Sequence, residues 1–431
     1  MGDVDSPHGR TGQGICQSQG TNLPMLALPV KHRLILFSDD WGRHPSSSQH
    51  LTARLVKRYP VLWVNTIGMR SPSLNREDLG KAISKLKSWI LPKPSGETTG
   101  QGQSHHTAIP ANMTVINPRM WPGYRTNWQR RINAGQVTKA IHQTLGPRQP
   151  DERRIAITTL PVTADLIGRL DVDRWVYYCV DDFSVWPGVD GGTMRELEAI
   201  QIAKADKLVA VSENLQKNMT QLGRHDSILL THGIDLNHWS PMPAGSDEQT
   251  AHSSLHLERY FEGLTGPIFL FWGLIDPRLD LQWCQAISEA GLGNLVLVGP
   301  QQSPDASLAT MRGVRMPGPA SYNDLPALAR KADVLVMPYA DLPVTRAMQP
   351  LKFKEYLATG KPVVGRNLPG IREWADAADL VEDHAAFVAA ARQRLADGIS
   401  PQQSAARERL KLETWDHKAL EFERAMLEPR A

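Results

Sequence analysis

The order of short apolar runs along this chain is the feature that most restricts its fold. In the first half, runs of strand-forming residues alternate with segments of helical pattern, and the runs lie at 33–38, 61–65, 154–159, 175–180, 207–211 and 228–230. The first run is close to continuously apolar, as strands buried on both faces of a parallel sheet are. Strands that alternate with helices predict a parallel, doubly wound sheet.

A second series of apolar runs follows a break in composition. These runs lie at 267–272, 294–300, 333–339 and 362–365, and residues 243–266 before them are rich in small and polar side chains. We place a domain boundary in that break. The chain is thus predicted to be α/β, with two Rossmann-like domains at 25–245 and 246–410, a last helix at 411–431 and a disordered tail at 1–24.

One stretch in the second series, residues 348–364, carries a candidate phosphate site. Pro350 is suited to open a helix, and Gly360 followed by Pro362 is suited to end it. Lys352 falls in the first turn, where a cation opposes the helix dipole. A bound phosphate would resolve that conflict, because helix N-termini attract anions. The alternative is a solvated lysine on an ordinary helix.

Loops that follow strands of an open α/β sheet are favoured ligand positions. The loop after the first run of the second series carries Gly273, which allows close backbone approach, and Arg278, which is able to pair with a phosphate in a fork. The loop after the first run of the chain offers Asp39, Asp40, Trp41, Arg43 and His44 as candidates to contact a substrate. The alternative for that loop is that Asp40 and Ser46 only cap turns.

Asp181 and Asp182 follow the run at 175–180 directly. Two neighbouring carboxylates repel each other, so one of them is able to hold a raised pKa and act as a general base. The alternative is that one of the two caps the next turn.

Two segments between 71 and 131 combine basic and aromatic residues. Lys81, Lys85 and Lys87 lie near Trp89 and Ile90, and Arg125, Arg130 and Arg131 lie near Trp121 and Trp128. Such segments are typical of an anionic membrane surface, although an ordinary packed helix has the same pattern.

Composition excludes several classes of protein. A net charge of +3 over 431 residues does not indicate a nucleic-acid-binding protein. The cysteines, Cys16, Cys179 and Cys284, form no CxxC pair, which argues against a zinc site or a disulfide scaffold and fits a reducing compartment. There is no apolar run of about 18 residues for a spanning helix, and residues 1–24 lack the apolar core of a signal peptide.

Five strings of sequence in this order resemble those of GT-B glycosyltransferases, in particular the family-4-like and glucuronosyltransferase-like branch of bacterial polysaccharide synthesis. The strings lie at 206–215, 232–235, 297–300, 332–339 and 348–364, and the resemblance covers about residues 31–425. It implies two domains that face a cleft and a last helix that crosses back to the first domain. The second domain would bind a nucleotide-sugar, with a UDP-sugar as the first expectation, and the first domain would bind a saccharide or lipid-linked acceptor. It also implies work in the cytoplasm, at the inner face of the membrane.

The resemblance assigns roles to residues of the second domain. Lys352 resembles the lysine that contacts the diphosphate, within the pattern Met348-Gln-Pro-Leu-Lys352, and Glu355 resembles the glutamate that binds the ribose hydroxyls. Tyr339 and the loop at 318–322 are placed where the base would lie. No metal or other cofactor is implied, because Lys352, Arg278 and helix N-termini are able to neutralise the leaving diphosphate.

One departure from the family pattern concerns the reaction. Many retaining members carry an additional glutamate eight positions before the one matched by Glu355, and here that position is Ala347. The departure leaves Asp181 or Asp182 as the base of an inverting transfer. Two other functions remain open, a GT-B nucleotide-sugar epimerase and a non-catalytic subunit of a polysaccharide assembly complex.

Overall fold

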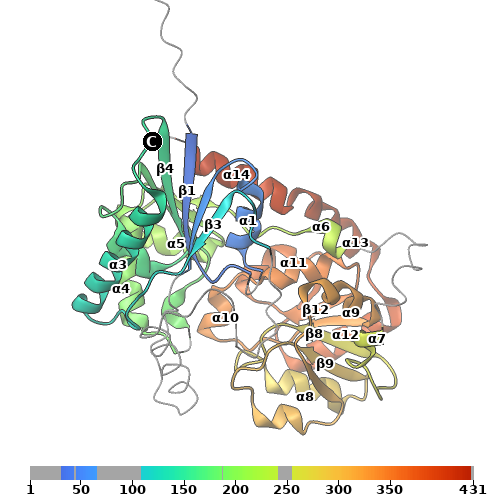
Figure 1. Ribbon diagram of the computed structural model, residues 1–431. Helices are drawn as coiled ribbons and strands as arrows, with labels where there is room; N and C mark the ends of the chain where they lie inside the picture. Colours follow the sequence, from blue (N-terminus) through green and yellow to red (C-terminus); the bar gives the residue numbers. More distant parts are fainter. Residues whose placement is uncertain (1–30, 43–44, 66–107, 187, 241–254, 429–431) are drawn as a thin grey trace, which may run out of the picture.

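The computed structural model describes residues 31–42, 45–65, 108–186, 188–240 and 255–428, which form two α/β domains (Figure 1). The first domain holds a seven-stranded sheet in the order β3-β2-β1-β4-β5-β6-β7, and every pair in it is parallel. Its strands are β1 (Lys31–Ser38), β2 (Val61–Asn65), β3 (Met113–Ile116), β4 (Glu152–Thr158), β5 (Arg174–Cys179), β6 (Lys207–Ala210) and β7 (Ile228–Leu229). The strand order reverses between β1 and β4, so the loops after these strands flank a switch point.

The second domain repeats this plan with six parallel strands in the order β10-β9-β8-β11-β12-β13. They are β8 (Ile268–Trp272), β9 (Asn294–Val298), β10 (Val314–Gly318), β11 (Val334–Met337), β12 (Val363–Arg366) and β13 (Asp379–Val381). Here the switch point lies between β8 and β11. The predicted α/β architecture of two doubly wound sheets is confirmed.

Helices connect the strands of both sheets. In the first domain they include α1 (Ser47–Leu55), α3 (Asn127–Leu145), α4 (Gly191–Lys204) and α5 (Glu213–Gln221). The second domain includes α8 (Leu281–Glu289), α9 (Leu325–Lys331), α10 (Pro343–Ala347), α11 (Leu351–Ala358), α12 (His384–Asp397) and α13 (Pro401–Arg407). Ser46 is the N-cap of α1, since its hydroxyl accepts a hydrogen bond from the backbone of Gln49, as in the capping alternative for this residue.

Each sheet has its own apolar core. The second core includes Ile234 and Trp239, whereas the composition break had suggested a boundary at 245. Trp239 belongs there because its ring stacks on Trp272 of β8, with centroids 5.3 Å apart. The short helix α6 (Leu236–Trp239) is therefore packed on the second domain.

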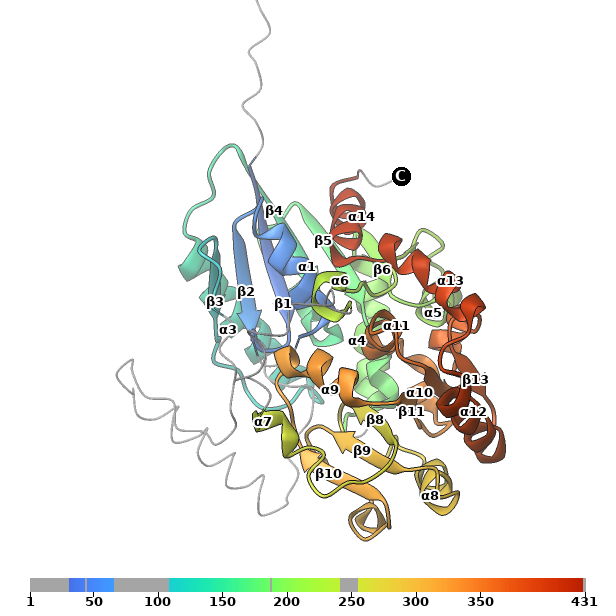
Figure 2. The same ribbon diagram turned by 90° about the vertical axis from the view of Figure 1, so that its right-hand side faces the viewer.

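The last helix returns to the first domain, as predicted. Figure 2 shows α13 and α14 (Trp415–Leu427) leading back from the second sheet to the first. Trp415 and Phe422 of α14 lie in the first core, and Phe422 packs edge-on against Tyr178 of β5. Within the described residues, the chain passes between the domains near 231–235 and near 413–415.

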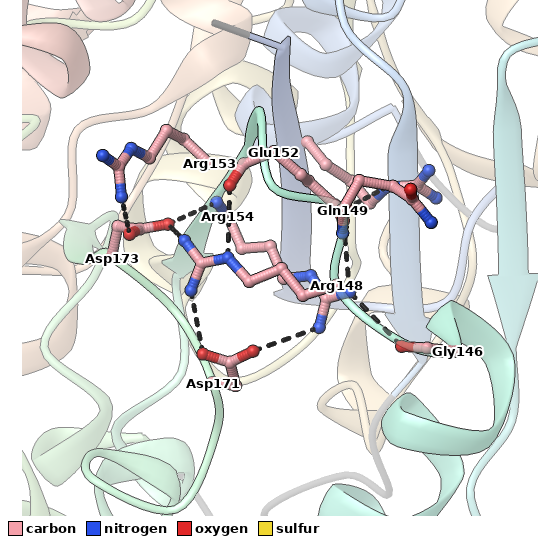
Figure 3. A network of polar contacts seen from close by, with 9 residues as sticks. Gly146, Arg148, Gln149, Glu152, Arg153, Arg154, Asp171 and Asp173 are labelled. Atoms are coloured by element: carbon pink, nitrogen blue, oxygen red, sulfur yellow. Dashed lines mark hydrogen bonds and ion pairs between the residues drawn. The ribbon is translucent and has the colours of Figure 1, made fainter.

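Ion pairs tie together the amino ends of β4 and β5, as Figure 3 shows. Arg148 pairs with both Asp171 and Asp173, and Arg153 reaches Asp173 at 3.0 Å. Arg154, with 3% of its side chain exposed, pairs with Glu152 at 3.2 Å. The carboxylates at this edge of the sheet thus form ion pairs with neighbouring arginines.

Several predictions concern residues outside the described ranges. They are the tail at 1–24, the segment with Lys81, Lys85, Lys87, Trp89 and Ile90, the two residues Arg43 and His44, and Cys16.

Candidate donor and acceptor site between the two sheets

Helix α11 forms as its sequence predicts. Pro350 is its N-cap residue, and Gly360 follows its end with a φ of +75°, a value that glycine adopts readily. The buried face is made by Phe353, Tyr356 and Leu357. This packing holds the first turn of α11, which carries Lys352, in a fixed place relative to β8.

Lys352 projects from the first turn of α11 over the loop after β8. Its Nζ donates to the Tyr339 hydroxyl at 2.8 Å and lies 4.6 Å from the centroid of the Phe271 ring. A Cβ on Gly273 would lie 1.8 Å from this Nζ, and Gly273 has a φ of +145°. The positive φ favours glycine at this position, and any larger residue would displace the lysine ammonium. Tyr339 is 1% exposed and holds the lysine through its hydroxyl, and its place beside the base stays a prediction.

Glu355 lies one turn further along α11. Its Oε2 accepts a hydrogen bond from the indole of Trp272 at 3.2 Å. Burial raises the pKa of Glu355 to about 7, although the charge of Lys352 lowers it. A carboxyl held in this way is suited to bind the hydroxyl groups of a ligand.

The 318–322 loop is joined to this group by aromatic contacts. Tyr322 stacks on His238 with centroids 4.2 Å apart, and its hydroxyl accepts from the Trp239 indole at 3.1 Å. Trp239 in turn stacks on Trp272. The functional neighbours that sequence reasoning missed are thus Trp239 and Trp272, and the only signal for them was the unusual count of 12 tryptophans.

Arg278 is held by side chains of its own domain. Its Nε donates to the two carboxylate oxygens of Asp276 at 3.0 and 2.9 Å, and its Nη1 lies 3.9 Å from Met348 Sδ. The predicted residues Gly273, Arg278, Met348, Lys352 and Glu355 thus lie on β8, α11 and the loops beside them. Asp276 was not predicted, and it fixes the guanidinium.

The two predicted carboxylates after β5 have different surroundings. Asp182 accepts from the backbone and the hydroxyl of Ser184, at 3.0 and 2.6 Å, and caps the short helix Phe183–Val185. Burial raises the pKa of Asp181 to about 6, and the charge of Arg278 acts on it in the opposite direction. Asp182 therefore has the capping role. Asp181 accepts a hydrogen bond from the Asp182 N–H at 3.1 Å, and it is close enough to Arg278 of the second domain for their charges to interact.

The loop after β1 uses its side chains to build its own structure. Asp39 accepts from Ser38, Ser46 and Gln49 at 2.8, 3.0 and 2.9 Å. Trp41 packs edge-on against Trp63, with centroids 4.9 Å apart. The predicted acceptor roles of Asp39 and Trp41 are therefore not supported by this geometry, whereas Asp40 is exposed.

The basic and aromatic segment 120–131 divides into two parts. Trp121 and Trp128 are 41% and 49% exposed and pack edge-on at 5.2 Å. Arg130 is buried and pairs with Asp165 and Glu196 at 2.8 and 2.7 Å, so its predicted place on a membrane-facing surface is wrong. Among the helices within the described ranges, none is long and apolar enough to cross a bilayer.

Comparison with known proteins agrees with this arrangement. Residues 269–397 match the family described as Glycosyl transferases group 1, and this range includes every predicted donor residue. A Bacillus subtilis protein named as the teichuronic acid biosynthesis glycosyltransferase TuaH is 29% identical over 220 residues. The match covers 46% of this chain and 51% of that relative, so the chain spans about half the length of the curated relative it matches.

Solved structures resemble nearly the whole chain. Anabaena Alr3699/HepE in complex with UDP and glucose has a TM-score of 0.61 at 14% identity, covering 92% of this chain and 99% of that one. A trehalose-phosphate synthase of Burkholderia xenovorans has a TM-score of 0.62 at 14% identity, covering 93% and 100%. A variant of S. aureus TarM bound to UDP and glycans has a TM-score of 0.57 at 9% identity, covering 93% and 100%. The chain thus has the GT-B fold, and its residues 269–397 match the group 1 glycosyltransferases.

Proposed function

We propose that this protein is a metal-independent glycosyltransferase that moves a sugar from a UDP-linked donor to a saccharide or lipid-linked acceptor in polysaccharide synthesis. The arrangement of Lys352 over Gly273, beside Glu355, is the observation that carries this proposal. It offers a cation for the diphosphate and a carboxyl for the ribose hydroxyls on one helix. The relatives named for UDP complexes and for teichuronic acid synthesis support the donor and the product class.

The leaving diphosphate would be stabilised by Lys352 and Arg278. Both side chains are pre-oriented, Lys352 by Tyr339 and Arg278 by Asp276. Pre-oriented charges stabilise a developing anion without reorganisation during the reaction. The positive end of the α11 dipole adds to this effect.

Asp181 would accept the proton of the acceptor hydroxyl as that oxygen attacks the anomeric carbon. Its raised pKa, about 6, brings its basicity towards neutral pH while leaving it ionised there. Asp182 would hold the turn in place by its contacts with Ser184. Bond formation on the face opposite the diphosphate makes this an inverting transfer, and the anomeric configuration of the product, read by NMR, tests that assignment.

The work would take place in the cytoplasm, with the first domain against an anionic membrane. Trp121, Trp128 and Ile132 are exposed together, and Arg131 is exposed beside them. Basic residues near such a surface contribute about 1 kcal/mol each. Co-sedimentation with phosphatidylserine vesicles should fall in Trp121→Ala/Trp128→Ala and with rising salt. Equal sedimentation of variant and wild type at low salt would contradict this surface.

Nucleotide binding is the decisive test of the function. Calorimetry with UDP, GDP and dTDP should give binding that is tightest for UDP and lost in Lys352→Ala. Incubation with UDP-sugars should give UDP only when a glycan or lipid-linked acceptor is present. Conversion of the donor to its epimer without acceptor would favour the epimerase, and absence of any nucleotide binding would favour a non-catalytic subunit.

A further inference from the structure

Helix α11 carries a second lysine whose position the donor site does not explain. Lys354 lies between Lys352 and Glu355 in sequence, but its side chain is only 5% exposed and points to the place where the chain passes between the domains. Its Nζ donates to the His232 carbonyl at 2.6 Å and to the Thr231 hydroxyl at 3.2 Å. Both of these residues belong to the first passage between the domains.

The same ammonium group also binds the return passage. It pairs with Glu413 at 2.5 Å, and Glu413 accepts from the Thr231 hydroxyl at 3.1 Å and pairs with Lys418 of α14 at 3.0 Å. The two passages are themselves joined, because Ile234 donates to the Glu413 carbonyl at 2.8 Å and Trp415 donates to the Ile234 carbonyl at 3.0 Å. Lys354 is therefore the point at which α11 and both passages meet.

A second contact from the segment before α11 holds the same backbone unit. The side-chain oxygen of Gln349 accepts from the His232 N–H at 2.9 Å. The N–H and the carbonyl of His232 are thus both held by residues 349–354. Gly233 next to it has no room for a side chain, because a Cβ there would lie 2.7 Å from Trp415 Cδ2. The passage is packed tightly enough for its orientation to follow that of α11.

A buried ion pair is a costly way to obtain stability alone. An apolar side chain of similar length would fill the same space without the desolvation of an ammonium and a carboxylate. What the lysine adds is direction, since it fixes three acceptors at defined distances. The acceptor domain has to present its base at one position relative to the donor sugar, and a displacement of about 1 Å costs up to a hundredfold in rate.

We propose that Lys354 is a positioning residue that fastens the donor-binding helix to both passages between the domains, and so fixes the orientation of the acceptor domain relative to bound donor. This inference rests on the proposed function for its kinetic consequence. The fastening itself is a property of the two domains and is measurable without any substrate.

Lys354→Met is the variant that tests this role, with Lys361→Met as its matched control. Lys361 follows the same helix but donates to the Arg330 carbonyl at 2.9 Å, inside the second domain. In Lys354→Met we expect UDP affinity within about threefold of wild type, because Lys352, Arg278 and Glu355 are untouched. We expect kcat to fall by about ten- to hundredfold. Lys361→Met should change neither. Glu413→Gln keeps the shape of the side chain and should also lower kcat. It serves as the test if Lys354→Met folds poorly.

Distances between the domains give a readout that is independent of the reaction. Spin labels at Lys139→Cys and Gln282→Cys, in a Cys16→Ser background, place one exposed probe on each domain, since Cys179 and Cys284 are buried. Pulsed EPR should give a broader distance distribution in Lys354→Met and Glu413→Gln than in wild type or Lys361→Met. An unchanged distribution or an unchanged kcat in both variants overturns the proposal. If the wild type binds no nucleotide, the proposed function fails, and the width of the distribution still decides the positioning role.

Discussion

Carboxylates at the two edges of the sheets meet opposite surroundings. At the amino ends of β4 and β5, Asp173 and Glu152 have lowered pKa values, because hydrogen bonds and charges of Arg148 and Arg154 outweigh their burial. Asp181 follows β5, and Glu355 of α11 contacts the last residue of β8. Both are half-buried with fewer opposing charges, and desolvation raises their pKa values to about 6 and about 7. The same chemical group therefore stabilises the fold at one edge and is available for a reaction at the other.

The largest effect should come from the carboxylate at the reactive edge. Asp181→Asn removes the proposed base, so kcat should fall about a hundredfold or more while UDP affinity changes little. Asp182→Asn is the matched control and should mainly weaken the cap of Phe183–Val185. Steady-state kinetics of both variants test this contrast. Near-wild-type turnover in Asp181→Asn would place the base elsewhere, with Asp40 the next residue to change.

The cation beside that edge should show the next largest effect. Lys352→Ala removes a charge-assisted contact of about 1.5–3 kcal/mol, which corresponds to about ten- to hundredfold weaker UDP binding. Gly273→Ala should act in the same direction, because its Cβ would displace the Lys352 ammonium. Calorimetry measures both variants. Unchanged UDP affinity in Lys352→Ala would show that the diphosphate does not bind at Lys352.

The amino edge should respond in stability and not in activity. Asp173→Asn loses ion pairs with Arg148 and Arg153, and we expect a loss of about 1–2 kcal/mol in the free energy of unfolding at pH 7. The folded-state pKa of Asp173 is lowered, so this stabilisation is present above the unfolded pKa and is lost as the pH falls through the folded one. Urea unfolding of variant and wild type should therefore show a smaller difference in stability at pH 3 than at pH 7. A fall in kcat beyond about twofold at pH 7 would contradict a purely structural edge.

The smallest effect concerns Glu355, whose contribution to stability should change with pH in the direction opposite to that of Asp173. Its folded-state pKa is raised to about 7, so its contribution to stability is complete below the unfolded pKa and is lost as the pH rises through about 7. Glu355→Gln should make the Tm less dependent on pH between 5 and 8, in protein without nucleotide. Calorimetric melting at several pH values gives this slope. A slope equal to that of the wild type would mean that Glu355 is ionised throughout.

Sequence pattern alone determined the class of fold and most residues of the candidate donor site. The alternation of apolar runs and helices predicted both sheets, and the patterns of α11 and of the loop after β8 predicted Lys352, Gly273 and Arg278. Glu355 was predicted from the family resemblance. These features are local, because a helix start, a helix stop and a strand-to-loop glycine depend on neighbouring residues. The resemblance to GT-B glycosyltransferases is confirmed. It could be read from sequence because each of its strings is a contiguous run of residues.

Only the tertiary structure decided which polar residues are already engaged. Arg130 looks as available in sequence as Arg131, yet it is held by Asp165 and Glu196. Asp182 binds the backbone and the hydroxyl of Ser184, whereas Asp181 accepts from the Asp182 N–H. The place of Tyr339 behind Lys352, and of Lys354 against His232 and Glu413, also depends on residues far apart in the chain. Burial and pairing are set by packing over long sequence distances, and these two quantities determine whether a charged side chain supports the fold or remains available to a ligand.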